Sequence, residues 1–532
     1  RVLSVRGTSG RDVNGFFMKN VRVTNSDGAG TRFYNVQNTD IDNCDINSTH
    51  TCVLIENKTN DNDTFRLKNS YIYNNQRVGF CAFRRGQIWL EGNTFEGKNA
   101  GYFKEPLWED DEKTVRRWNN GAEHRIIESG GSYSYIADNT LKGDYGTRVP
   151  VEANDGEGIL FQEGNADFTG SVSSAEKNSL TDAGRAFLQD EFSGRYVFII
   201  SGKGCGQVRK IISNTSDTLA VDNDWDIQPD SGSRYEIDSY YANRNIIVNN
   251  KFNVNSKKAG IFFYVKAVDN IVSGNTFTDS SGIFFNPSAV NTVYDGKTVH
   301  RTYMAYFNRV ISNILVRNAA ENSTMTDGGY RYSLGISNYG DAGYSYNRRP
   351  GEDVMLSMFQ EYRDNSVTLL NAENMVEPAN LFIKQFYDYF GAIGVSSAVN
   401  DGKIHSNGFI VQRNKLSGTP YGVYMGCSAK NTVITDCEFS NNSKEAVSFS
   451  ENNVNTKVFG NKTNNSHNLY EGGRYINVTY NGTIGRLKLN GKAGKEYSGK
   501  SVCIMVYNSA ADISDVENYL YFTNFTETDA DG

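Results

Sequence analysis

The chain of 532 residues is poor in proline and cysteine and contains no long hydrophobic run. Only 7 prolines occur beside 51 glycines, a balance that suits a fold of strands and tight bends. No apolar run approaches the roughly 18 residues of a membrane-spanning helix, so no membrane span is expected. The 54 basic residues do not outnumber the 61 acidic ones, which argues against a nucleic-acid-binding surface.

The 7 cysteines are odd in number, and the sequence has no Cys-x-x-Cys or His-x-x-x-His pair. We therefore expect buried thiols rather than a disulfide framework, and no structural metal site. No signal peptide is visible and the first residue is Arg, so we expect the sequence to be a mature or trimmed form.

A short pattern, aliphatic-x-x-Asn-x-apolar, recurs ten times, with adjacent copies about 23–26 residues apart. A period of this length indicates one supersecondary unit stacked on copies of itself. The unit is too short for a strand–helix–strand crossover, so it predicts one turn of a solenoid of short parallel strands. One copy, at 311–316, has Ile314 in the third slot. In the other nine copies this slot holds Cys44, Ser70, Asn93, Asn139, Asn250, Asn275, Asn414, Cys437 and Asn461.

The Asn residues of this slot are expected to form a ladder down one edge of the solenoid. Asn tolerates a left-handed backbone, and its amide can bond the amide of the next coil. Between these corners a second motif, such as Gly260-Ile-Phe-Phe-Tyr264, predicts a further strand with alternating inward and outward side chains. The inward set includes Val53, Ile55, Ile159, Phe161, Ile261, Phe263, Ile283 and Phe285, and the outward set Glu56, Phe83, Gln162, Tyr264, Asn286 and Tyr424.

An Asn two residues before an inward aromatic, followed by Gly-Ile-x-Phe as at 282–285, resembles the right-handed parallel β-helix of pectate-lyase-like proteins. The resemblance covers roughly residues 10–475 and implies an all-β domain, which we place at 1–480. It also implies a secreted or cell-surface bacterial protein. The superfamily holds polysaccharide lyases, glycoside hydrolases, sugar epimerases and phage tailspikes, so the motif is specific for the fold and weak for the function.

Residues 167–237 interrupt the repeat with a strand pattern of their own, which we interpret as a small inserted β-barrel. The stretch Trp225-Asp-Ile-Gln-Pro-Asp230 makes it similar to a short module inserted in many secreted bacterial β-helix proteins. Residues 481–532 resemble the opening of a β-sandwich module of Gram-positive surface proteins. The chain stops at Gly532 before such a module could close, so we expect further modules in the natural protein.

Three insertions, at about 97–124, 167–237 and 287–308, leave from loops beside the same strand of neighbouring coils. A binding groove on the exposed face of that strand is the simplest reason for their clustering. The first insertion mixes charged and aromatic residues, as a sugar-binding loop would. The candidate substrate-binding residues are Arg84, Trp108, Trp118, Gln162, Tyr264, Lys266 and Asn286.

Four carboxylates are the candidate catalytic residues: Glu157 and Glu163 lead, followed by Asp155 and Glu128. Neighbouring coils lie about 4.8 Å apart, so carboxylates one or two coils apart are separated by about 5 or 10 Å. Those separations match retaining and inverting glycoside hydrolysis respectively. Close carboxylates raise one another's pKa, which keeps one of them protonated as the acid.

We therefore predict a carbohydrate-active enzyme and favour a glycoside hydrolase, whose paired carboxylates require no metal or other cofactor. A polysaccharide lyase is the first alternative, because a base such as Lys266 or Tyr264, with Ca²⁺ on clustered carboxylates, could serve β-elimination. A non-catalytic adhesin or tailspike-like glycan binder is the second, with inert acids. A polysaccharide or glycan is the expected partner in all three cases.

Overall fold

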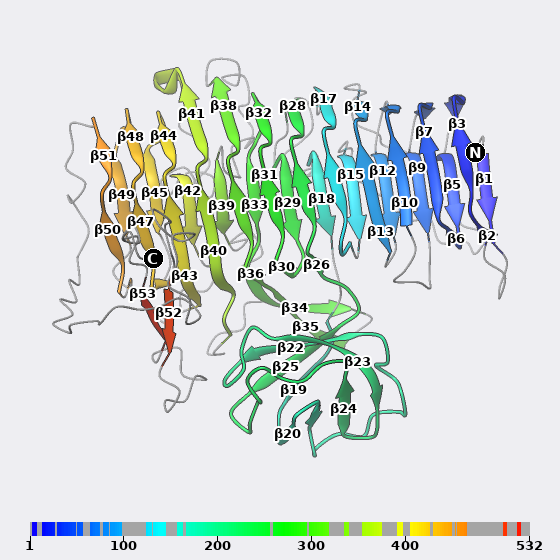
Figure 1. Cartoon of the computed structure of the whole chain (residues 1–532), viewed down its shortest axis with the longest axis vertical. Helices are drawn as coiled ribbons and strands as arrows, with labels where there is room; N and C mark the ends of the chain where they lie inside the picture. Colours follow the sequence, from blue (N-terminus) through cyan, green and yellow to red (C-terminus); the bar gives the residue numbers. More distant parts are fainter. Residues whose placement is uncertain are drawn as a thin grey trace, which may run out of the picture.

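The protein is described here by a computed structural model. It covers residues 3–7, 13–26, 29–48, 51–56, 64–74, 78–83, 86–97, 124–129, 131–144, 157–162, 166–255, 259–294, 297–318, 335–339, 354–374, 391–396, 405–425, 429–449, 453, 455–464, 504–507 and 519–522. These residues form a long stack of coils, each built of short parallel strands (Figure 1). The fold is a right-handed parallel β-helix, as predicted.

Three parallel sheets run along the stack, and each coil contributes a strand to each of them. The first sheet carries the predicted groove on its outer face. Its twelve strands are, in order, β1 (Leu3–Arg6), β5 (Ala29–Tyr34), β9 (Thr51–Glu56), β12 (Val78–Phe83), β15 (His124–Ser129), β18 (Ile159–Gln162), β29 (Ile261–Tyr264), β33 (Ile283–Phe285), β39 (Ile336–Tyr339), β42 (Gly391–Ser396), β45 (Tyr421–Met425) and β49 (Glu445–Phe449).

The second and third sheets complete each coil. The second includes β7 (Thr39–Asp42), β10 (Thr64–Lys68), β13 (Gln87–Glu91), β16 (Tyr135–Ala137), β26 (Ala242–Asn243), β27 (Ile246–Val248), β30 (Ala267–Val268), β31 (Ile271–Ser273), β36 (Ala305–Tyr306), β37 (Arg309–Ile311), β40 (Ser357–Arg363) and β43 (Ser406–Gln412). The third includes β8 (Asp45–Ser48), β11 (Tyr71–Asn74), β14 (Thr94–Gly97), β17 (Thr140–Asp144), β28 (Lys251–Asn255), β32 (Thr276–Thr278), β38 (Ile314–Asn318), β41 (Ser366–Leu370), β44 (Lys415–Ser417) and β48 (Glu438–Ser440).

The interior of the stack is filled by the side chains predicted to point inward. All eight of the predicted inward residues are at most 1% exposed. The aromatic ones stack from coil to coil, with ring centroids 4.8 Å apart for Phe161 and Phe263 and 4.6 Å apart for Phe263 and Phe285. Period-two alternation therefore identified the core face of the first sheet correctly.

The Asn ladder runs through consecutive coils as a chain of buried amide hydrogen bonds. Each Nδ2 donates to the Oδ1 of the next coil, at 2.9–3.0 Å from Asn139 to Asn250 and from Asn250 to Asn275. The bonded members are Asn93, Asn139, Asn250, Asn275, Asn313, Asn365 and Asn414, with Cys44 and Ser70 before them and Cys437 and Asn461 after them.

Two details of the predicted ladder are wrong. The slot assigned to Ile314 belongs to Asn313, one residue earlier. The left-handed backbone belongs to the residue before the ladder position, such as Asn249 with φ of 57°, rather than to the ladder residue itself. The ladder Asn is thus selected by hydrogen bonding, and its predecessor by backbone conformation.

The insertion predicted at 167–237 folds as a seven-stranded antiparallel sheet, here called the module (residues 166–238). It has a hydrophobic core of its own, which includes Val197, Ile199, Leu219, Tyr235 and Ile237. Its strands are β19 (Ala166–Ser171), β20 (Ser174–Glu176), β21 (Ser179–Thr181), β22 (Tyr196–Ser201), β23 (Val208–Asn214), β24 (Thr218–Val221) and β25 (Arg234–Asp238).

The module lies on one side of the β-helix, next to the hairpin of β34 (Ser288–Tyr294) and β35 (Lys297–Tyr303) (Figure 1). Near the C-terminus, β52 (Ile504–Tyr507) pairs antiparallel with β53 (Tyr519–Phe522). The predicted boundary at 480/481 lies outside the described residues. Among the described residues, Ala372–Asn374 form a 3-10 turn, η3. Within the described residues, no helix has the length and apolar character needed to cross a membrane.

Four of the five cysteines that the structure describes are buried, as expected, and Cys205 is partly exposed. Cys44, Cys52 and Cys437 are buried inside the coils. Burial raises the pKa of the Cys437 thiol to about 12. Such a thiol is inert at neutral pH, because the thiolate is the reactive form.

Candidate functional site

The outer face of the first sheet presents one residue per coil in register. Glu56 pairs with Phe83, and Gln162 pairs with Tyr264 two coils further on. Phe83 is 44% exposed, and Glu56, Gln162 and Tyr264 are half-buried. This row, here called the groove row, is the part of the predicted groove that the described residues support. The Tyr264 ring lies 5.0 Å from the ring of Tyr303 on the neighbouring hairpin.

A second row on the same face is covered rather than open. Leu54, Cys81, Leu160, Phe262 and Phe284 point outward from successive strands, yet each is at least 92% buried and they form one hydrophobic cluster. The outer face is therefore buried along this row. Only the groove row is available to a ligand among these positions.

The leading acid, Glu157, is buried. It comes directly before β18, its carbonyl accepts from the Arg125 backbone N–H at 3.4 Å, and the residue is 1% exposed. The prediction of an open rim position for Glu157 is therefore wrong. The residues directly before β18 are buried beside the neighbouring strands.

Glu128 lies in β15, where the backbone register pairs it with Ala82 and Phe161, two core residues. Ser129 pairs with Phe83. The outward placement of the Glu128 side chain stays a prediction. The other predicted residues of this region, Asp155, Glu163, Arg84, Trp108 and Trp118, lie outside the described residues.

Lys266 is not a groove residue. Its side chain is 3% exposed and forms ion pairs with Glu236, at 2.8 Å, and with Asp238, both on β25 of the module. Burial lowers the pKa of Lys266, but the two carboxylates outweigh that effect and leave the pKa raised. The outward prediction failed because the strand ends at Tyr264, and the chain turns toward the module before Lys266. Asn286, predicted to face out, is likewise buried.

The module and the β-helix also share a hydrophobic cluster. Phe198 and Ile200 of β22 pack with Tyr241, Met304 and Met358 of the helix, all of them buried. The backbone N–H of Met355 donates to the Ile200 carbonyl at 3.3 Å. Together with the Lys266 ion pairs, this cluster fixes the module against the β-helix as one body.

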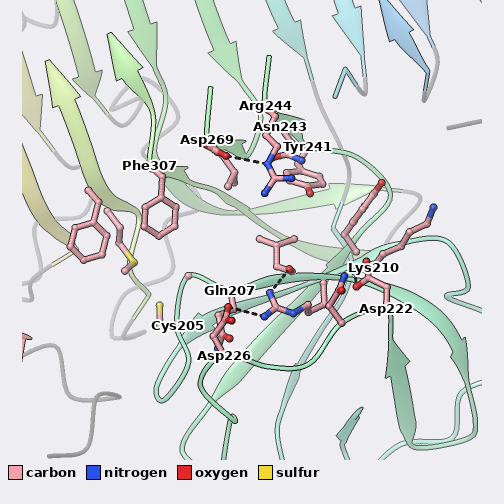
Figure 2. A pocket seen from close by; sticks show the side chains of 18 of the residues that line it. Cys205, Gln207, Lys210, Asp222, Asp226, Tyr241, Asn243, Arg244, Asp269 and Phe307 are labelled. Carbon is pink, nitrogen blue, oxygen red and sulfur yellow. Dashed lines mark hydrogen bonds and ion pairs between the residues drawn. The ribbon is translucent and has the colours of Figure 1, made fainter. Parts of the chain in front are cut away.

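A cleft of about 1360 Å³ lies between the module and the second sheet (Figure 2). The module lines it with the loop after β22 and with β23, including Gln207, Arg209 and Lys210. The β-helix lines it with the row of residues that follows β26, β30 and β36, including Arg244 and Phe307.

The helix side of the cleft is a row of left-handed residues. Tyr133, Arg244, Asp269, Phe307 and Phe359 all have φ between 50° and 60° and follow one another from coil to coil. Asp269 accepts from Arg244 Nε at 3.1 Å and from Arg309 at 3.2 Å. The Phe307 and Phe359 rings are stacked, with centroids 5.5 Å apart.

The sequence contains a signal for this row that the repeat search missed. Ala242-x-x-Asn245, Ala267-x-x-Asn270 and Ala305-x-x-Asn308 share one spacing, five residues ahead of the main ladder. Asn245, Asn270 and Asn308 form a second buried amide ladder, with Nδ2 to Oδ1 distances of 2.9 and 2.8 Å. The residue before each of these Asn is the left-handed one that faces the cleft.

Comparison with known proteins gives a family match to part of the chain and several similar solved structures. A model of the family described as periplasmic copper-binding protein (NosD) matches residues 352–521. The described residues bring together no group of three or more His, Cys, Asp or Glu side chains that could hold a metal ion, so a copper site does not fit them. No curated protein matches the chain.

Three solved structures are similar over long stretches. The tailspike protein gp49 of Pseudomonas phage LKA1 is 9% identical, with a TM-score of 0.22, over 64% of this chain and 47% of that protein, so this chain spans about half its length. The alginate lyase AlyF-OU02 is 11% identical, with a TM-score of 0.30, over 86% and 80%. The Streptococcus pneumoniae surface protein and adhesin PfbA is 9% identical, with a TM-score of 0.21, over 85% and 91%. Such low values say nothing about the function of this chain.

Proposed function

We propose that this protein is a secreted or cell-surface carbohydrate-active enzyme that binds a polysaccharide along the groove row and hydrolyses it. The observation that carries the proposal is the groove row itself. It presents Glu56, Phe83, Gln162 and Tyr264 at the intervals of the coil stack. Aromatic rings pack against the apolar faces of sugars, and carboxylate and amide groups bond hydroxyls, so a row repeated from coil to coil suits an extended glycan.

One observation supports hydrolysis over β-elimination, for which Lys266 and Tyr264 are the candidate bases. Lys266 is buried and paired with two carboxylates, so a lyase would have to use Tyr264 of the groove row. Hydrolysis needs two carboxylic acids and no metal. Glu163 follows the last residue of β18 directly in sequence, and we propose that it acts with Asp155 as the acid and base pair, because Glu157 is buried.

The test is a panel of polysaccharides assayed for released reducing ends. On the substrate that reacts, Glu163→Gln is expected to lower turnover by about 10²–10⁴-fold, because a general acid or base is lost while the shape is kept. Glu157→Gln should be measured beside it. Glu438→Gln, on β48 and half exposed, is the matched control and should keep wild-type turnover.

Three outcomes would contradict the proposal in different ways. Products with an unsaturated sugar that absorbs in the ultraviolet would identify a lyase. Binding without any turnover would identify an adhesin or tailspike-like binder. If Phe83→Ala left binding unchanged, the groove row would not be the binding surface.

A further inference from the structure

We propose that the cleft between the module and the second sheet is a second carbohydrate site, which binds a stretch of neutral glycan. This inference goes beyond the groove row and does not rest on it, because the two surfaces belong to different sheets and share no lining residue. The cleft volume of about 1360 Å³ exceeds the 300–1,000 Å³ of ordinary small-molecule sites, so a chain ligand fits it better than a single sugar.

The inference rests on the residue types that occupy the left-handed row. Further along the same row, where the cleft does not reach, the positions hold Gly408 and Asn431, the residue types that this backbone prefers. Within the cleft, beside Asp269, they hold the bulkier Tyr133, Arg244, Phe307 and Phe359 instead. A bulky residue in this region costs of order 1–3 kcal/mol and persists only where the surrounding structure holds it. Core packing does not explain the choice, since Phe307 is 37% exposed.

The aromatic end of the row offers a platform for sugar rings. Phe307 and Phe359 come from adjacent coils, and their planes are within 11° of each other. Figure 2 shows the labelled Phe307 directed into the space between the β-helix and the Cys205–Gln207 loop. Gly206 on that loop lies beside the edge of these rings, because an added Cβ would be 3.4 Å from Met358 and 3.9 Å from Phe307.

The polar end of the row is balanced in charge. Its lining includes the cations Arg209, Lys210 and Arg244 and the anions Asp222, Asp224, Asp226 and Asp269. The main pairs are already formed, Arg244 with Asp269 and Arg209 with Asp226 at 2.9 Å. A polyanion would find no excess of positive charge here, whereas a hydroxyl-rich neutral chain can bond to the outer edges of these paired groups.

The two walls are fixed, so binding needs little ordering. The shared hydrophobic cluster and the Lys266 ion pairs hold the module against the helix on the side of the cleft away from solvent. A preformed site loses less free energy to ordering when it binds a flexible chain. The module thus acts as the second wall of a binding site.

The experiment uses the whole chain and saturation-transfer difference NMR with titration calorimetry. The probes are maltohexaose, cellohexaose, xylohexaose and mannohexaose, with hexaguluronate as the anionic comparison. Phe307→Asn and Phe359→Asn place in the row the residue type found at Asn431, so the backbone should tolerate them. Each is expected to weaken the binding of a neutral hexasaccharide at least 10-fold. Phe17→Ala, a 61% exposed aromatic at the other end of the stack, should leave it unchanged.

The proposal is overturned if no neutral probe binds, if only hexaguluronate binds, or if both cleft variants bind like the wild type. Thermal midpoints within a degree or two of the wild type would show that loss of binding is not loss of folding. Phe83→Ala separates the two sites: it should leave cleft binding intact even if the groove row has no function. Binding that disappears only in Phe83→Ala would assign it to the groove row alone.

Discussion

At the scale of single residues, the main lesson of the structure is Lys266. An apolar alternation ending in Tyr264-Val-Lys266 predicts an inward Val265 and an outward lysine. Val265 does lie in the core of the β-helix, but Lys266 is buried at the junction with the module. A lysine is buried this completely only when it is paired, and here Glu236 and Asp238 supply both partners. The residue therefore reports how the module is attached rather than what the protein binds.

Replacing Lys266 tests this role. Lys266→Met removes the cation and leaves two carboxylates buried without their partner, so we expect a loss of about 3–5 kcal/mol in the free energy of unfolding. The measurement is urea denaturation followed by circular dichroism. Lys19→Met is the control, because Lys19 is half exposed and pairs with Asp42 at the surface, where such pairs contribute little to stability. Equal losses in the two variants would show that the buried pairs are not special.

Alkaline titration tests the direction of the Lys266 shift. Its pKa is raised in the folded state, because the attraction of Asp238 and Glu236 outweighs the effect of burial. The stabilisation is therefore complete below the unfolded pKa of about 10.4 and is lost as the pH rises through the folded value.

The expected observation is a stability gap between the wild type and Lys266→Met that is constant from pH 8 to 10 and narrows above. Burial also raises the pKa of Tyr235 and Tyr241, which lowers stability at high pH in the same direction. These tyrosines are present in both proteins, so the gap isolates Lys266. A gap that widens with pH would contradict the assignment.

At the scale of elements, the coil repeat was largely predictable and its exceptions have a clear cause. Around 310–316 the apolar residues of Val310-Ile-Ser-Asn-Ile-Leu-Val316 fit the repeat in two frames. Only the frame of Val310, Asn313 and Leu315 has Asn in the third slot, and the hydrogen bonds confirm it. A one-residue shift exchanges the inward and outward faces, so this ambiguity matters. Asn365 was missed because long excursions on both sides of it hide the period.

The ladder predicts a large cost for losing one amide. Asn250 Oδ1 accepts from the backbone N–H of Asn139 at 3.0 Å, and its Nδ2 donates to Ile136 O and to Asn275 Oδ1. Asn250→Ala leaves these buried groups unsatisfied, and we expect a loss of about 2–4 kcal/mol on the usual cost of such groups.

Two further substitutions calibrate that measurement. Asn250→Ser should lose less, because Ser70 occupies the same slot in another coil and its hydroxyl accepts from Cys44 N at 3.0 Å. Asn253 is exposed on β28, the strand that follows Asn250. Asn253→Ala should change stability by no more than about 0.5 kcal/mol. If Asn250→Ala changed stability as little as Asn253→Ala does, the ladder would not have a structural role.

At the scale of the whole molecule, a repeat can be read from sequence and a docking surface cannot. Each coil restates the same pattern, so the stack and its core follow from a few periodicities. The cleft instead joins a row of the β-helix that includes Arg244 and Phe307 to the module loop near Gln207, which lies outside the repeat. The candidate site suffers for the same reason: alternation assigns a face to Gln162 and Tyr264, but it does not tell that Glu157 and Asn286 are covered by neighbouring segments.

The module also bears on the stability of the β-helix, although its own core is separate. Replacing the module, residues 166–238, by a Gly/Ser linker uncovers Tyr241, Met304 and Met358 and takes both carboxylate partners from Lys266. We expect the strand signal in circular dichroism to persist, since the ladders and the main core stay intact. The thermal midpoint should fall, and a hydrophobic dye should bind to the uncovered surface.

The decisive comparison combines this deletion with Lys266→Met. In the intact protein the substitution leaves two buried carboxylates without their partner. In the deletion both carboxylates are gone and Lys266 faces water. The substitution should then cost less than about 1 kcal/mol, so the two changes are far from additive, as is expected of groups in direct contact. Additive losses would mean that Lys266 stabilises the helix by itself. The module would then be an appendage, and the cleft beside it would lose its fixed second wall.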